Sequence, residues 1–107
     1  MLKTVEPQTL DVELRSGGEP LLVAFLKRNE RFRSQYLALD EASRRFPGRL
    51  RCYLYDTDYL DMAVNRFMVK GTPTFLLFSD GREVDRLIGE SDRASLEEFL
   101  ANALSGH

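Results

Sequence analysis

Two kinds of apolar pattern alternate along the chain: short, mainly apolar runs and longer stretches of helical spacing. The continuous apolar runs at residues 21–26 and 75–78 are typical of strands that are covered on both faces. Residues 2–5 and 50–55 are further strand candidates. The sequence Ser-Asp-Gly at residues 79–81 is typical of a hairpin turn, and Val84, Leu87 and Ile88 predict the strand that follows it.

Helices are predicted between these strands. Thr9 is a candidate N-cap for a short amphipathic helix that ends at the glycines of residues 17–18. A second helix is expected to follow the polar loop of residues 27–33 and to continue to about Phe46, because Pro47 and Gly48 then interrupt it. Asn29 and Glu30 are its candidate caps.

Two shorter signals complete the order. After the third strand, a short helix is expected to be capped by Asp56, Thr57 or Asp58. The last helix is expected to be capped by Ser91 or Asp92. The buried side of the short helix is predicted to hold Met62, Ala63 and Phe67. The last helix has the clearest helical spacing, at Leu96, Phe99, Leu100, Ala103 and Leu104. The order β-α-β-α-β-α-β-β-α predicts an α/β fold with helices on both faces of a mixed sheet of four to five strands.

Length and composition narrow the class of protein. The 107 residues fit a single domain, 1–107, and the 43% hydrophobic and 30% charged contents are ordinary for a globular chain. No apolar run approaches the roughly 20 residues of a membrane span. Residues 1–6 lack the apolar core of a secretion signal, so a cytoplasmic location is expected.

Few residues are available for chemistry. Cys52 is the only cysteine and His107 the only histidine, which excludes an intrachain disulfide and any histidine-based catalytic set. The single cysteine and histidine also leave no metal site to predict. We find no phosphate-cradling glycine loop and predict no cofactor. The net charge of −2 argues against binding to nucleic acid. The acids Asp56, Asp58 and Asp61 lack the glycine and glutamate of a calcium loop and are assigned to helix capping.

The second half of the chain resembles a thioredoxin domain. Gly71-Thr72-Pro73-Thr74, four apolar residues, Asp80-Gly81 and then Gly89 are similar to the hairpin region of that family. Further similarities cover nearly the whole chain: Val23-Ala24-Phe25, Leu39-Asp40-Glu41, Asp58, and Leu96 to Leu100. The resemblance implies a three-layer α/β/α sandwich in which Pro73 is cis and faces the position of a redox-active Cys-x-x-Cys.

That position carries no thiol in this chain. Counting forward from the strand at Val23 puts residues 30–33 at the motif, and counting back from Leu39 puts residues 29–32 there. The former active-site loop is therefore Asn29, Glu30, Arg31, Phe32 and Arg33. The buried Asp and Lys of active relatives correspond to Ala24 and Leu54, so we assign no catalytic residue and expect the site to be rebuilt as core.

The first functional hypothesis is a redox-inactive module that binds or helps to assemble a protein or peptide partner. The predicted partner-binding residues are Lys27, Arg28, Arg31, Arg33, Thr72 and Pro73. The positive charges of the first four suit an acidic partner. The alternative for the basic residues is a solvated loop, and for Pro73 a bend that serves the fold alone. A second hypothesis is a monothiol oxidoreductase that acts through Cys52. The alternative for Cys52 is a small buried apolar residue, because unpaired cysteines tend to be buried. A structural or dimerising domain without a ligand is the third.

Overall fold

The computed structural model describes residues 2–106, and its elements follow the predicted order with one added 3₁₀ turn. They are β1 (Lys3–Val5), α1 (Pro7–Ser16), β2 (Leu21–Phe25), α2 (Phe32–Ser43), β3 (Arg51–Tyr55), η1 (Thr57–Tyr59), α3 (Leu60–Phe67), β4 (Thr74–Ser79), β5 (Arg82–Ile88) and α4 (Arg93–Gly106). No helix among these residues is long and apolar enough to cross a membrane.

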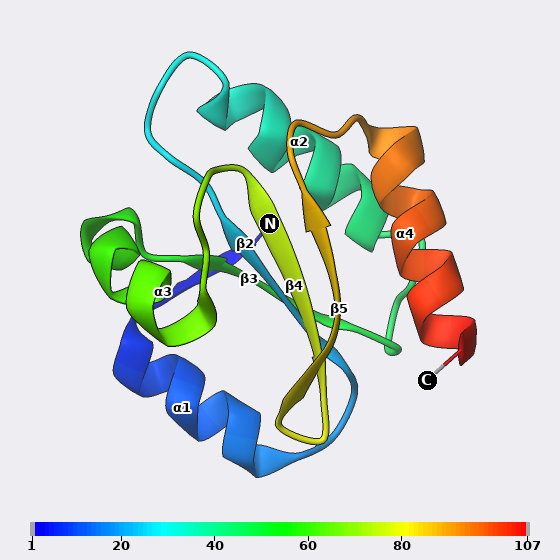
Figure 1. The fold of residues 1–107 in the computed structure, drawn as a ribbon. Helices are drawn as coiled ribbons and strands as arrows, with labels where there is room; N and C mark the ends of the chain where they lie inside the picture. The colour runs from blue at the N-terminus through cyan, green and yellow to red at the C-terminus, as the bar shows by residue number, and fades with distance from the viewer. Residues whose placement is uncertain (1, 107) are drawn as a thin grey trace.

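The five strands form one mixed sheet in the order β1-β3-β2-β4-β5. β3 runs parallel to both β1 and β2, whereas β4 is antiparallel to β2 and to β5. Helices α2 and α4 cover one face, and α1 and α3 cover the other (Figure 1). The predicted three-layer thioredoxin-like sandwich is therefore confirmed.

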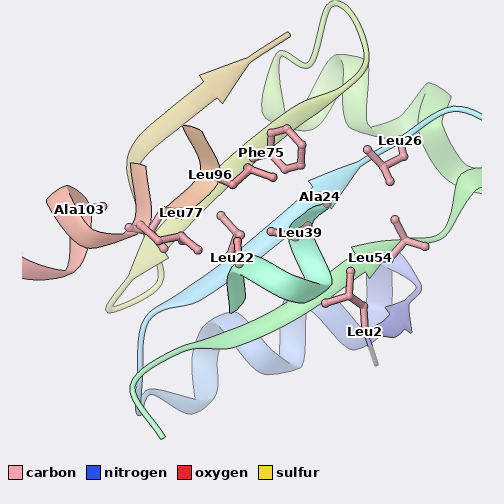
Figure 2. Packing of buried hydrophobic residues seen from close by; sticks show 12 residues of the cluster. Leu2, Leu22, Ala24, Leu26, Leu39, Leu54, Phe75, Leu77, Leu96 and Ala103 are labelled. Carbon is pink, nitrogen blue, oxygen red and sulfur yellow. The ribbon is translucent and has the colours of Figure 1, made fainter. Parts of the chain in front are cut away.

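The two central strands, β2 and β4, are buried on both faces, as their continuous apolar runs predict. Successive side chains of a strand point to opposite faces. Leu22 and Ala24 of β2 accordingly join Phe75 and Leu77 of β4 in the core beneath α2 and α4 (Figure 2). The alternate residues of both strands pack against α1 and α3.

Some local predictions were wrong. α1 begins two residues before Thr9, at Pro7, a residue that suits the first turn because it has no N–H to satisfy; Glu6 is the N-cap. α2 ends at Ser43 instead of near Phe46, and residues 45 and 46 donate tighter i→i−3 hydrogen bonds. Met62 is half exposed, although it was expected on the buried side of α3.

The hairpin between β4 and β5 turns at Asp80 and Gly81. Both have positive φ, +53° and +79°, which is the geometry of the two-residue turns that suit Asp-Gly. A Cβ at residue 81 would also lie 3.1 Å from the carbonyl oxygen of Leu14 in α1. Glycine is therefore needed there for both its φ and its size.

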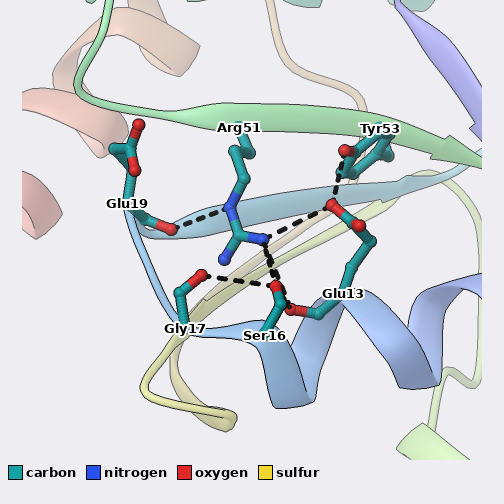
Figure 3. A network of polar contacts seen from close by, with 6 residues as sticks. All are labelled: Glu13, Ser16, Gly17, Glu19, Arg51 and Tyr53. Carbon is teal, nitrogen blue, oxygen red and sulfur yellow. Dashed lines mark hydrogen bonds and ion pairs between the residues drawn. The ribbon is translucent and has the colours of Figure 1, made fainter.

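A polar network joins α1 to the beginning of β2 and β3 (Figure 3). The Arg51 guanidinium donates to the carbonyl oxygen of Glu19 at 3.0 Å, to the carbonyl oxygen of Glu13 at 3.3 Å and to Ser16 Oγ at 3.2 Å. Its Nη1 also lies 3.4 Å from Glu13 Oε1, which accepts the Tyr53 hydroxyl at 2.6 Å. One arginine thus ties three segments together at this end of the sheet.

Candidate functional site

The predicted site lies at the opposite end of the sheet, where β2 ends, α2 begins and β4 starts. Leu26, Asn29, Phe32, Thr72 and Pro73 line a shallow depression there. Its volume is about 10 Å³. That is roughly the space of one water molecule, whereas sites for small molecules are typically about 300–1,000 Å³. The depression is too small for a small-molecule substrate.

The Thr72–Pro73 peptide bond is cis in the structure. On either side of it the loop is anchored by hydrogen bonds. Thr74 Oγ1 donates to the carbonyl oxygen of Gly71 at 2.7 Å, and the Gly89 N–H donates to the carbonyl oxygen of Pro73 at 2.9 Å. Within residues 2–106, by contrast, the N–H and C=O of Thr72 take part in no hydrogen bond. Thr72 therefore presents a free donor and a free acceptor beside Pro73.

The loop predicted to correspond to the active site, residues 29–33, forms a tight turn before α2. Asn29 Oδ1 accepts the Arg31 N–H at 2.9 Å, and Arg31 is the N-cap residue without a side-chain cap of its own. Of the two counting frames considered for the missing motif, residues 29–32 put both end positions on the depression, because Asn29 and Phe32 line it. Glu30 and Arg33 do not line it.

The predicted partner-binding residues divide into groups. Lys27 and Arg31 line the depression with Thr72 and Pro73, and Arg31 also lies 3.8 Å from the Glu90 carboxylate. Arg28 turns aside: its Nε donates to Thr57 Oγ1 at 3.1 Å, and its guanidinium lies 5.1 Å from the centre of the Phe32 ring. Arg33 is exposed and lines no part of the depression.

Sequence reasoning missed Gln35. This side chain of α2 is only 4% exposed and lines the depression from below. Its Nε2 donates to the carbonyl oxygen of Ser91 at 3.0 Å, and its Oε1 accepts the Ser91 N–H at 3.1 Å. Gln35 therefore holds the segment between β5 and α4 against α2. A glutamine among the apolar positions of a predicted helix was the available signal.

Ala24 and Leu54, the residues predicted to replace a buried charge pair, lie in the core. Ala24 and Leu54 are direct neighbours in the register of β2 and β3, and are 0% and 5% exposed. Both belong to the apolar cluster beneath α2 and α4. Because the two charges are replaced together, neither is left buried without its partner.

Cys52 lies away from this site. It pairs with Leu22, which in turn pairs with Leu77, whereas Thr74 pairs with Phe25 at the site end. Cys52 is therefore three residues away from Thr74 along the strands and two strands away across the sheet. Each of these two separations is about 10 Å. Burial, and then the charge of Asp40, raise the pKa of the thiol to about 12. This environment disfavours the thiolate that sulfur chemistry requires.

The side chains that could bind a metal ion are the last candidates for a site. Among residues 2–106, no three His, Cys, Asp or Glu side chains lie close enough together to hold a metal ion.

Comparison with known proteins agrees with the resemblance. The sequence model of the thioredoxin family matches residues 33–102. The chain is 30% identical over 60 residues to an M-type chloroplastic thioredoxin of Pisum sativum, covering 56% of this chain and 35% of that protein. It is 28% identical over 67 residues to the chloroplastic thioredoxin M3 of Oryza sativa subsp. japonica, covering 63% and 38%. Thioredoxin 1 of a Nostoc species is 23% identical over 66 residues, 62% of each chain. The matches span less than two thirds of the length of these relatives.

Proposed function

This chain belongs to the thioredoxin family, and we propose that it is a redox-inactive member that binds an extended segment of a partner protein. The binding surface, named here the Pro73 face, is formed by Lys27, Arg28, Arg31, Arg33, Thr72 and Pro73. Its role is that of a binding or assembly module.

The free backbone groups of Thr72 carry this proposal. An N–H and a C=O that are left unpaired at the start of a strand can pair with an extended peptide, as an added strand does. The anchors on either side, at Gly71 and Gly89, hold the loop in place. A partner therefore meets a preformed donor and acceptor, which lowers the entropy cost of binding.

The shape and charge of the Pro73 face favour a peptide over a metabolite. The depression beside Pro73 holds about 10 Å³, so a ligand must lie across the surface instead of entering a cavity. Two cationic side chains, Lys27 and Arg31, line it, and Arg28 and Arg33 belong to the same loop; these charges suit a partner with negative charge. Such complementarity acts mainly on the association rate and on specificity.

The position of the thiol supports binding over monothiol chemistry. Reactive cysteines have a lowered pKa, which helix N-termini or neighbouring cations provide. Cys52 has the opposite shift, and it lies at the other end of the strands. Disulfide exchange at Pro73 would need sulfur within bonding distance of that loop.

The cellular compartment is a separate proposal. For this chain we propose the cytoplasm, whereas the names of the pea and rice relatives assign those two proteins to the chloroplast. Subcellular fractionation of cells that express the full protein is the test.

Selection from a phage-displayed library of random 12-residue peptides on the immobilised chain tests the binding function. The wild type is expected to retain and enrich peptides, and a variant with Lys27, Arg28, Arg31 and Arg33 all changed to Glu is expected to retain none of them. The matched control changes four exposed cations away from the face to Glu: Lys3, Arg15, Arg49 and Arg82. Failure of the wild type to enrich any peptide, or equal loss in both variants, would contradict the proposal.

A further inference from the structure

A groove of about 560 Å³ lies on the other side of Thr72 from the depression. It is bounded by the loop after β2, by the start of η1 and α3, and by residues 69–72. Three of its residues, Leu60, Val64 and Val69, are apolar, and Lys70 stands beside them. These four residues belong to none of the sites described so far. Because Thr72 lines both hollows, a chain that pairs with Thr72 passes the mouth of this groove.

The apolar part of the groove combines a firm wall with exposed surface. Val69 is only 3% exposed and packs into the core beneath α1 and α3, so its position is fixed. Val64 leaves 47% of its surface to solvent. Covering such surface with a large apolar side chain is favourable, because it removes apolar area from water. The groove is therefore suited to one apolar side chain of a partner.

The charges of the groove are not equally available. Asp58 and Asp61 lie in the first turns of η1 and α3, where the helix N-terminus stabilises negative charge. The Arg28 guanidinium is held by Thr57 and Phe32. The ammonium groups of Lys27 and Lys70, in contrast, make no hydrogen bond or ion pair with any other side chain of residues 2–106. These two cations remain for the carboxylate of a partner.

We propose that the segment bound at the Pro73 face places a large apolar side chain in this groove, over Leu60, Val64 and Val69. A neighbouring aspartate or glutamate of the same segment pairs with Lys70 and Lys27. The inference rests on the proposed function and names the chemistry of its partner. It adds Val64 and Lys70 as residues that set specificity, while the Thr72 backbone supplies sequence-independent pairing.

The same random 12-residue library tests this inference. Peptides enriched on the wild type are expected to share a large apolar residue with an acidic residue close to it. Val64→Asp should remove the apolar preference, and Lys70→Glu should replace the acidic preference by a basic one. For a synthetic peptide of the enriched sequence, fluorescence polarisation should show roughly tenfold weaker binding to each variant. Val12→Asp on α1 and Arg82→Glu on β5 are the matched controls, because both residues are exposed and lie outside the groove.

The outcomes separate the two proposals. A wild type that enriches no peptide contradicts the proposed function, and this inference with it. A wild type whose enriched peptides lack the apolar and acidic pair contradicts this inference alone. So do peptides that bind Val64→Asp and Lys70→Glu as tightly as the wild type. Circular dichroism and urea unfolding of each variant show whether a loss of binding reflects a loss of fold.

Discussion

The two ends of the sheet differ in how fully their polar groups are paired. At the end where β2 and β3 begin, here the closed end, Arg51 reaches Glu13, Ser16 and Glu19 (Figure 3). At the end where β2 finishes and β4 begins, here the open end, the backbone of Thr72 and the ammonium group of Lys70 have no partner among residues 2–106. Groups that are already paired stabilise the fold, whereas free groups at a firm surface remain available for binding.

The single thiol, Cys52, lies next to Arg51 at the closed end, so its reactivity tests whether that end is closed to chemistry. With a pKa of about 12, Cys52 should react with iodoacetamide on the order of a thousandfold more slowly at about pH 8 than in the urea-unfolded chain. The rate should then rise about tenfold for each unit of pH, since only the thiolate reacts. Mass spectrometry of the alkylated chain measures both. A native rate within tenfold of the unfolded one would place a reactive sulfur in the fold.

Gln35 tests what holds the open end in place. Gln35→Leu keeps the size of the side chain but leaves the buried N–H and C=O of Ser91 without partners. We expect a loss of about 2–6 kcal/mol in the free energy of unfolding, at about 1–3 kcal/mol for each of the two unsatisfied groups. Urea titration followed by circular dichroism gives the value. Ser34→Ala, at the exposed neighbouring position, is the control, and an equal loss there would remove the special role of Gln35.

Arg51 tests the closed end. Arg51→Met keeps the apolar stem and removes the guanidinium, and should lower the free energy of unfolding by about 1–2 kcal/mol, since its acceptors are partly reached by water. Binding of selected peptides should not change. Lys70→Glu at the open end should weaken peptide binding but change the free energy of unfolding by less than about 0.5 kcal/mol. Calorimetry measures the stability of both variants, and peptide titration measures their binding. Weaker peptide binding by Arg51→Met would contradict the division of roles between the two ends.

Tyr53 gives the smallest effect and a pH signature. Its hydrogen bond to Glu13 is the main cause that raises the pKa of the Tyr53 hydroxyl above its ordinary value of 10.0. A group with a raised pKa stabilises the fold fully below its unfolded value and loses that contribution as the pH rises through the folded value. Tyr53→Phe should therefore cost about 1 kcal/mol near neutral pH, and the difference from the wild type should shrink above about pH 10. A difference that is constant up to high pH would show that the fold does not raise the pKa of the Tyr53 hydroxyl.

The sequence was sufficient for the layers of the fold because the apolar runs of β2 and β4 leave no solvated face. The burial of Ala24 and Leu54 could also be predicted, since it needed only a count along two strands. The ends of the helices were harder to predict from the sequence. Thr9 is a common type of N-cap residue, yet α1 begins at Pro7, whose ring suits the first turn.

The site could be predicted only in part, for reasons of geometry. Residues that are adjacent along a loop were treated as one basic patch, yet Arg28 turns to Thr57 and Arg33 lies outside the depression. Gln35 and Lys70 were missed because residues that they meet are distant in sequence: Ser91 for Gln35, and Lys27 across the groove for Lys70. Such juxtapositions depend on how helices dock, which local patterns do not encode.

Reduction of insulin disulfides, with dithiothreitol as the electron donor, tests the central claim most directly. The account predicts that the wild type and Cys52→Ala both reduce insulin at the rate of dithiothreitol alone, because no sulfur lies at the Pro73 loop. A wild-type rate above that background which disappears in Cys52→Ala would contradict the account.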